Sequence, residues 1–114
     1  MAGQYILDAD GKPVECSDLR EWGHWLNSSA ERVVEATELV GGGKVSTVFL
    51  GIDYNFAGKG DPVLWETMLF WDGHDDDQTM ERYTSQAAAK EGHARWVKQY
   101  GGKLTGRYIE LGDE

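Results

Sequence analysis

The stretch that decides the fold is Lys44–Tyr54, which reads KVSTVFLGIDY. In an extended chain its side chains fall into two alternating sets, Val45, Thr47 and Phe49 on one face and Ser46, Val48, Leu50 and Ile52 on the other. Both sets are largely apolar. We therefore expect the longest strand of the protein here, in the centre of a sheet and covered on both faces.

A second strand is predicted over Val63–Trp71, which reads VLWETMLFW and follows a loop at residues 55–62. Glu66 is the one charged residue in this otherwise apolar run. Three interpretations of Glu66 stay open: a general base whose pKa is raised by burial, an ion pair with Arg82 or Arg95, or a place on a surface row.

The N-terminal part predicts two short strands, Gln4–Leu7 and Pro13–Cys16, joined by the turn sequence DADG. A helix should begin at Ser17 or Asp18, because Asp18 can cap it with Glu21 three residues later. An apolar stripe at helical spacing is expected to face the core: Leu19, Trp22, Trp25 and Leu26. A strand at Arg32–Val40 and a glycine turn at 41–43 lead into the central strand.

The C-terminal part predicts an acidic turn at Asp72–Gln78, a last strand at Thr79–Tyr83, and a helix from Thr84 or Ser85 to about Tyr100. The face of this helix that should pack on the sheet carries Ala89, His93, Trp96 and Tyr100. Gly101 and Gly102 should end the helix, and residues 107–111 could add an edge strand.

Short turns between strands, with helices before and after them, indicate one α+β domain spanning residues 1–114. We expect an antiparallel sheet of about four to six strands in a meander of hairpins, with two helices packed against it.

The charge is strongly acidic and unevenly placed. The 114 residues carry 20 acidic and 11 basic side chains, a net charge of −9. Residues 82–107 are the exception, with one acidic residue, Glu91, against Arg82, Lys90, Arg95, Lys98, Lys103 and Arg107. We expect an acidic face that meets a basic protein surface, and no direct nucleic-acid binding, because the domain would repel phosphates.

The single cysteine, Cys16, excludes an internal disulfide and fits a reducing cytoplasm. No signal peptide or membrane span is expected, because no apolar run approaches ~20 residues. We therefore expect a soluble cytoplasmic protein without membrane association. A homo-oligomer is an open alternative.

The candidate binding residues are aromatic and charged positions in two segments: Tyr54, Asn55, Phe56 and Lys59 in the loop, and Asp75, Asp76 and Asp77 in the acidic run. Lys59 with its flanking glycines could cradle an anion, but the spacing is not that of a P-loop, and a plain hairpin loop is the alternative. Tyr54 and Phe56, at a strand end and in a loop, are the aromatic residues most open to a partner.

No metal, cofactor or catalytic residue is predicted. A calcium loop beginning at Asp72 would need Gly at its sixth position and Glu at its twelfth, where Asp77 and Tyr83 stand. His24 and His93 have no second ligand one helical turn away. Cys16 lies near a helix start, but the neighbouring carboxylates oppose a reactive thiolate, and we expect a bystander thiol.

Several stretches and single residues, taken in order, resemble a family of small phage and prophage proteins for which no activity is established: Tyr5–Asp8, Pro13–Val14, Asp18–Leu19, Trp22, Trp25, Val45–Phe56, Pro62–Phe70, Glu81–Ser85, Ala88 and Gly92–His93. The resemblance covers nearly the whole chain except the acidic run and the tail at 103–114. It implies a viral origin and assigns no catalytic residue.

These observations predict a phage-type accessory protein that binds and is not an enzyme. The leading hypothesis is inhibition of a host antiviral defence protein through an acidic surface, in the cytoplasm of a bacterial host. One alternative is a sponge that sequesters a nucleotide immune signal with aromatic rings and Lys59 or the basic segment. Another is a virion or assembly component.

Overall fold

A computed structural model describes residues 3–39, 42–71 and 74–101, with residues 71 and 74–79 described by their backbone alone. The N-terminal elements are β1 (Tyr5–Leu7), β2 (Pro13–Glu15), α1 (Leu19–Ser28) and the 3-10 turn η1 (Ala30–Arg32). The remaining elements are β3 (Val33–Leu39), β4 (Gly43–Phe49), β5 (Trp65–Trp71), β6 (His74–Tyr83), α2 (Gln86–Trp96) and its π-helical continuation η2 (Val97–Gly101). The α+β prediction is confirmed.

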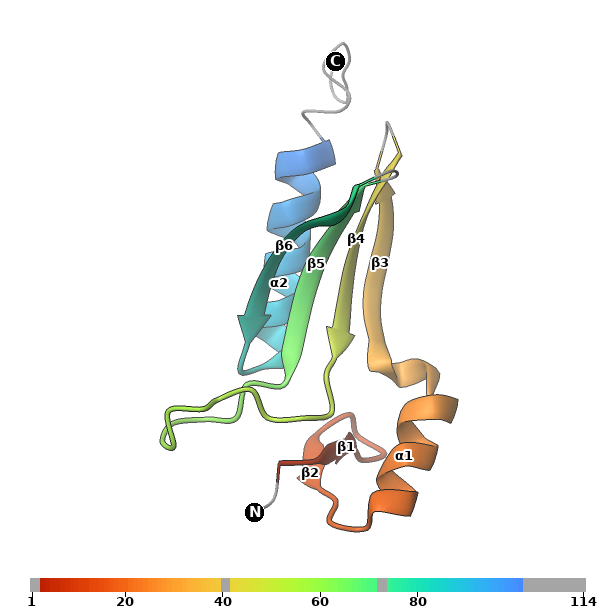
Figure 1. The fold of residues 1–114 in the computed structure, drawn as a ribbon, viewed down its shortest axis with the longest axis vertical. Helices are drawn as coiled ribbons and strands as arrows, with labels where there is room; N and C mark the ends of the chain where they lie inside the picture. Colours follow the sequence, from red (N-terminus) through yellow and green to blue (C-terminus); the bar gives the residue numbers. More distant parts are fainter. Residues whose placement is uncertain (1–2, 40–41, 72–73, 102–114) are drawn as a thin grey trace.

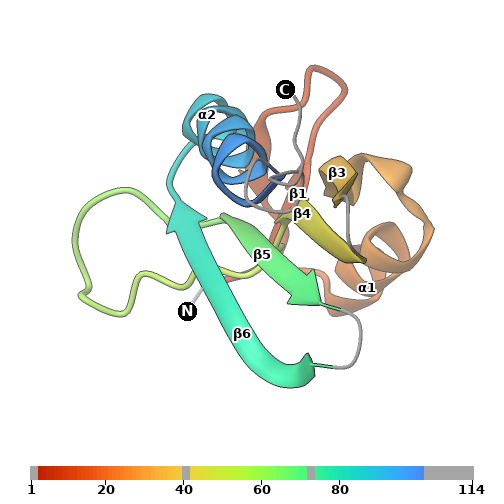
Figure 2. The same cartoon turned by 90° about the horizontal axis from the view of Figure 1, so that it is seen from above.

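The main sheet is an antiparallel meander with strand order β3-β4-β5-β6, and β1 and β2 form a separate two-stranded sheet. Helix α2 crosses one face of the main sheet, as Figure 2 shows. The small hairpin and α1 lie at one end of the sheet, the lower end in Figure 1. We call the face that packs against α2 the inner face.

The centre of the inner face is covered. Val45, Thr47 and Phe49 of β4 are each 0% exposed, and from α2 the predicted residues Ala89, His93 and Trp96 are buried against them. Ser85 caps α2 by accepting the amide of Ala88. The sequence thus predicted the buried side of the sheet and the helix that covers it.

The prediction that β4 is covered on both faces is wrong. On its other face Ser46 and Val48 are only half-buried. Helix α1 does not reach this face, because it packs against β1 and the end of the sheet. The first residue of its predicted apolar stripe, Leu19, is 62% exposed, while Trp22, Trp25 and Leu26 are half-buried.

The predicted strand Lys44–Tyr54 is also too long, since β4 ends at Phe49. Gly51 has a φ of +79°, which turns the chain out of the sheet. The Trp22 indole donates to the Gly51 carbonyl at 3.0 Å, and this tethers the departing chain to α1. Among the described residues the longest strand is instead β6, which has 10 residues.

The acidic segment was expected to form a turn, and this prediction is wrong for residues 74–78. These residues belong to β6, where His74 stands opposite Trp71 of β5. Pairing with β5 outweighs the low strand propensity of aspartate. The predicted helix stop at Gly102, the edge strand at 107–111 and residues 72–73 of the acidic turn lie outside the described residues.

Candidate functional site

The face of the main sheet opposite α2 is open and apolar at its centre. We define the open face by the residues Val33, Ala36, Ser46, Val48, Met68, Phe70 and Met80. Three of the apolar side chains are well exposed, namely Val33 at 53%, Phe70 at 42% and Met80 at 48%. The strand register places Met68 directly opposite both Ser46 and Met80, so the middle of the face is a row of unbranched or small side chains.

An ion pair stands at the edge of this apolar centre. Glu66 of β5 lies opposite Arg82 of β6, and the Arg82 Nε donates to the Glu66 carboxylate at 2.9 Å. The ring of Tyr54 lies 4.3 Å from the guanidinium carbon of Arg82. Of the interpretations left open for Glu66, the ion pair is confirmed with Arg82 as the partner, while Arg95 pairs with Glu81 instead.

The aromatic loop, residues 53–63, extends the open face beyond the end of the sheet. Phe56 is 83% exposed, and its ring centroid lies 5.9 Å from that of Tyr54. Tyr54 in turn stacks on Arg82, which is bound to Glu66. A continuous surface therefore runs from Phe56 through Tyr54 and Arg82 to Met80 and Met68.

Side-chain hydrogen bonds hold the aromatic loop in one shape. Asp53 Oδ1 accepts the amides of Asn55 at 2.8 Å and Val63 at 2.9 Å. The Asn55 amide group donates to the carbonyls of Lys59 at 2.8 Å and Asp61 at 2.9 Å. Phe56 is thus presented to solvent by a preorganised loop, which lowers the entropy lost when a partner covers it.

The substitution Asn55→Ala is expected to loosen this loop and to lower the free energy of unfolding by about 1 kcal/mol, because it removes bonds to two carbonyls and to the Ala57 amide. Hydrogen exchange should accelerate at the Ala57 amide. The control is Lys59→Ala, an exposed change in the same loop, which should alter neither quantity. Equal exchange rates in both variants would contradict the role assigned to Asn55.

The structure brings together two of the predicted site residues, Tyr54 and Phe56. Asn55 shapes the loop, and Lys59 is exposed on its rim. No hydrogen bond joins Lys59 to the aromatic pair among the described residues. Asp75, Asp76 and Asp77 lie in the edge strand β6. Their side chains fall outside the described part, so their role in binding stays a prediction.

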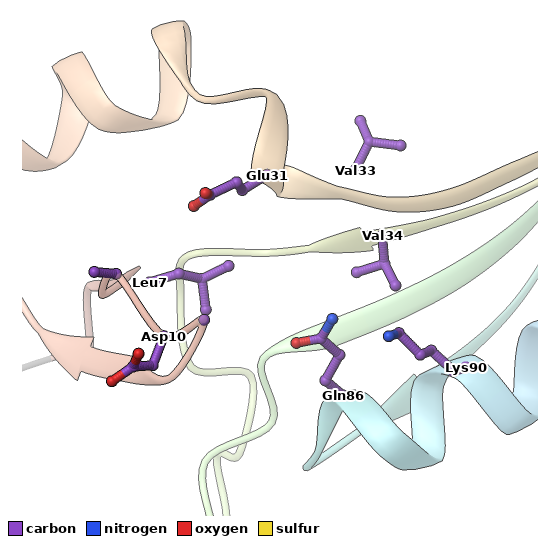
Figure 3. Close-up of a pocket in the computed structure, with 9 residues that line it drawn as sticks. Leu7, Asp10, Glu31, Val33, Val34, Gln86 and Lys90 are labelled. Carbon is purple, nitrogen blue, oxygen red and sulfur yellow. The ribbon is translucent and has the colours of Figure 1, made fainter.

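A cleft of about 380 Å³ lies between the β1–β2 turn, the start of β3 and the start of α2. Figure 3 shows Asp10 and Glu31 on one side of it and Gln86 and Lys90 on the other. The rest of the lining is formed by Leu7, Ala9, Gly11, Val33 and Val34. A nucleotide would need a ring to stack on and a surplus of positive charge for its phosphates. This lining has no aromatic ring and has two carboxylates against one amine.

A chain of buried polar groups runs along the inner face. His93 of α2 lies between two threonines, with Nε2 2.9 Å from the Thr37 hydroxyl and Nδ1 2.7 Å from that of Thr47. The Thr47 hydroxyl lies 2.6 Å from that of Thr67, which lies 3.0 Å from the Tyr83 hydroxyl. Each of the four strands contributes one of these hydroxyl groups.

This chain of hydrogen-bonded side chains ends at the Glu81 carboxylate, whose oxygens can only accept hydrogen bonds. Glu81 Oε1 accepts the indole N–H of Trp96 at 2.8 Å, the guanidinium of Arg95 at 3.3 Å and the Tyr83 hydroxyl at 3.1 Å. The bond to Trp96 is the main cause that lowers the pKa of Glu81, with Arg95 and Tyr83 acting in the same direction against the effect of burial.

The ionised end fixes the direction of every bond in the chain. Tyr83 has one hydroxyl hydrogen, and the carboxylate of Glu81 takes it, so Thr67 must donate to the Tyr83 oxygen. Because each threonine hydroxyl also has a single hydrogen, Thr47 must donate to Thr67, and His93 Nδ1–H must donate to Thr47. This places a hydrogen on His93 Nδ1. Burial lowers the pKa of His93 and so favours the neutral ring, whose Nε2 then accepts from the Thr37 hydroxyl.

The middle of this hydrogen-bond chain cannot touch a solute in the folded state, because Thr47 and Thr67 are 0% exposed and His93 is 1% exposed, whereas Thr37 and Glu81 at its two ends are half-buried. Burial lowers the pKa of His93, while Glu35 acts to raise it. Burial also raises the pKa of Tyr83. The arrangement serves to position the strands against α2 and leaves recognition to the open face and the loop.

The sequence analysis missed the open face, although two signals for it are visible. The outer row of β4 and β5 contains Lys44, Ser46 and Glu66, whereas the inner row has no charge. A single helix follows the sheet in the described part of the chain, and one helix covers one face. Arg82 was predicted as a possible partner of Glu66 and as part of a basic segment, but its contact with Tyr54 was not predicted.

Within residues 3–39, 42–71 and 74–101, no three side chains of the metal-binding types converge. No helix in the described part is both long and apolar enough to cross a membrane. Comparison of the chain with protein-family models, with curated proteins and with solved structures found no match.

Proposed function

We propose that this protein acts by binding another protein, with the open face and the aromatic loop as its contact surface. The observation that carries the proposal is the exposure of apolar side chains along one continuous surface, from Phe56 at 83% to Phe70 at 42% and Met80 at 48%. Contiguous apolar surface of this kind is a mark of interaction sites. Single exposed apolar residues would carry no such meaning.

Three features favour a protein partner over a small ligand. The open face is broad and spans all four strands of the sheet. Phe56 is an aromatic anchor on a preorganised loop, and such anchors dominate the energetics of protein interfaces. The methionine pair Met68 and Met80 can adapt its shape to a partner surface.

The target class that we propose is a bacterial host protein, in particular an antiviral defence protein that the chain inhibits inside the host cell. The net charge of −9 supports a basic target surface, because complementary charge accelerates association. The resemblance to phage proteins supports a target in a bacterium. No step of bond making or breaking is required of the protein.

The test uses the tagged full-length chain and two charge-introducing variants, Phe56→Asp on the loop and Met80→Asp on the open face. Leu19→Asp is the matched control, because Leu19 is 62% exposed on α1, away from this surface. In bacteria that carry defence systems, the unsubstituted protein should restore phage plating, and its stoichiometric partner should be recovered by affinity purification.

The two surface variants should lose both the partner and the plating phenotype, and Leu19→Asp should keep both. Circular dichroism must show that all variants are folded. Recovery of the same partner with all three variants would refute the assignment of the surface.

A further inference from the structure

We infer that the cleft between the β1–β2 turn, the start of β3 and the start of α2 binds a small molecule with a cationic group and a carboxylate at the two ends of an aliphatic chain. The ligand class that fits is a free basic amino acid such as arginine. The inference goes beyond the proposed protein contact and does not depend on it. Three observations support it: a cleft of suitable size, polar side chains without partners around it, and opposite charges on its two sides.

The cleft has the size and the apolar lining of a small-molecule site. Its volume of about 380 Å³ falls in the range of roughly 300–1,000 Å³ that such sites occupy. Leu7, which is 7% exposed, and the half-buried Val34 line the cleft and belong to one hydrophobic cluster of the core. The methylene groups of a ligand can therefore bury apolar surface against the core.

Four polar side chains around the cleft have no partner in the described part of the chain. Asp10, Glu31, Gln86 and Lys90 all line the cleft. Within residues 3–39, 42–71 and 74–101, none of these four side chains makes a hydrogen bond or an ion pair. Their donors and acceptors are thus available to a ligand.

The charges of these side chains are separated across the cleft. Figure 3 shows Asp10 and Glu31 on one side, and Gln86 and Lys90 on the other. Gln86 and Lys90 stand one helical turn apart on α2, so their side chains share one face of the helix. A ligand cation would pair with the carboxylates of the first side, and a ligand carboxylate with the amine and amide of the second.

The net charge of the cleft selects among such ligands. Two carboxylates against one amine give a net charge of −1. A basic amino acid at neutral pH has two cationic groups and one carboxylate, a net charge of +1, and so balances the lining. The guanidinium group of arginine also matches a carboxylate through two parallel hydrogen bonds.

The walls of the cleft are held in place without a ligand. In the β1–β2 turn, Asp8 Oδ1 accepts the amide of Asp10 at 2.9 Å. In η1, Ser29 Oγ accepts the amide of Glu31 at 3.2 Å. Gln86 is the first residue of the capped helix α2. Ligand binding therefore requires little ordering of the backbone, which favours affinity.

The inference is tested with three small molecules: L-arginine, agmatine, which lacks the carboxylate, and citrulline, in which a neutral group replaces the guanidinium. Binding to the full-length protein is followed by NMR titration of the backbone amides. We expect arginine to bind with a Kd of about 1 mM or below and to shift the amides of Gly11, Val34 and Gln86, which come from three separate elements. Agmatine and citrulline should each bind about 3- to 10-fold more weakly.

Two variants remove one charge from each side of the cleft. Glu31→Gln should weaken the binding of both arginine and agmatine by about 3- to 10-fold, because both carry a cation. Lys90→Gln should weaken arginine by a similar factor and should not weaken agmatine, which has no carboxylate. The matched controls are Glu21→Gln on α1 and Lys59→Gln in the aromatic loop, which make the same changes at exposed positions and should leave arginine binding unchanged.

Three results would overturn the inference. The first is the lack of a shift at Gly11, Val34 and Gln86 in arginine at about 20 mM, well above the expected Kd. The second is equal weakening by Glu31→Gln and Glu21→Gln, which would show that overall charge attracts the ligand. The third is equal affinity for arginine and agmatine. None of these results bears on the protein contact of the open face, which has its own test through Phe56→Asp and Met80→Asp.

Discussion

Replacement of Gly92 by alanine should lower the free energy of unfolding by about 3 kcal/mol and the Tm by roughly 10–20 °C. Gly92 is buried in α2, where the helix passes over the end of β6. A Cβ atom at this position would lie 2.1 Å from the Tyr83 hydroxyl oxygen, and 2.5 and 2.6 Å from two of its ring carbons. The ring cannot give way easily, because its hydroxyl belongs to the buried polar chain. The helix would have to rise from the sheet.

The matched control is Gly23→Ala, which makes the same chemical change in α1 with the opposite expected sign. No atom lies within 4 Å of a Cβ built on Gly23, so the alanine should stabilise the protein by roughly 0.5–1 kcal/mol through its higher helix propensity. Chemical denaturation should show that the free energy of unfolding falls for Gly92→Ala and rises for Gly23→Ala.

The clash itself is tested by a double-mutant cycle. In a Tyr83→Leu background the cost of Gly92→Ala should fall by about 2 kcal/mol, because the ring that collides with the new Cβ is gone. The same cost in both backgrounds would show that the contact between α2 and Tyr83 is not the cause.

The second large effect is a loss of stability on mild acidification. Burial lowers the pKa of His93 below its usual 6.5, so between that value and the folded pKa the unfolded chain binds more protons than the native protein. The contribution is fully present above about pH 6.5 and is lost as the pH falls towards the folded pKa. The slope can reach about 1.4 kcal/mol per pH unit for one proton.

Other groups near His93 set the limits of the pH range in which its protonation lowers the free energy of unfolding. Glu35 on β3 acts to raise the pKa of His93 and so narrows the window, and the Glu81 carboxylate lies at the far end of the polar chain. Because the pKa of Glu81 is lowered from 4.5, its own contribution to stability is lost only as the pH falls below about that value. Measurements between about pH 7.5 and 5 therefore isolate the histidine.

Urea denaturation between about pH 7.5 and 5 should show that the free energy of unfolding falls with the pH in the unsubstituted protein. The same slope is expected in His24→Gln, which alters an exposed histidine on α1. His93→Gln should remove it, because glutamine can accept from Thr37 and donate to Thr47 without titrating. Long-range proton–nitrogen NMR should find the hydrogen of His93 on Nδ1. A hydrogen on Nε2 would contradict the proposed direction of the polar chain, and a slope that survives in His93→Gln would contradict the assignment of the pH dependence to His93.

The buried half of this fold could be predicted from the sequence, and the candidate site could be predicted only in part. Alternation at Val45, Thr47 and Phe49 and helical spacing at Ala89, His93 and Trp96 both report burial, which is a local property of the chain. The strand limits could not be predicted in this way. The chain turns out of the sheet at Gly51, where its carbonyl accepts a hydrogen bond from Trp22, which is distant in sequence.

The candidate site depends even more on distant partners. Tyr54 and Phe56 were recognised by their place at a strand end, but the stacking of Tyr54 on Arg82 joins two segments that only the sheet brings together. The apolar content of Val48 and Met68 indicated burial, and nothing in their spacing shows that no helix reaches them. Local pattern predicts which residues prefer to be covered, and only the packed structure shows which of them are.

The buried polar chain also has a consequence for how freely this domain can vary. It passes through one side chain on each strand and one on α2, so a slip of any strand by a single residue would leave buried groups unsatisfied at about 1–3 kcal/mol each. Apart from the Glu66–Arg82 pair on the open face, the side chains that fix strand register are thus on the side facing the helix. The open face carries fewer of these constraints, so its residues can be replaced to bind new partners while the fold is kept. The domain is therefore a suitable starting point for a designed binder.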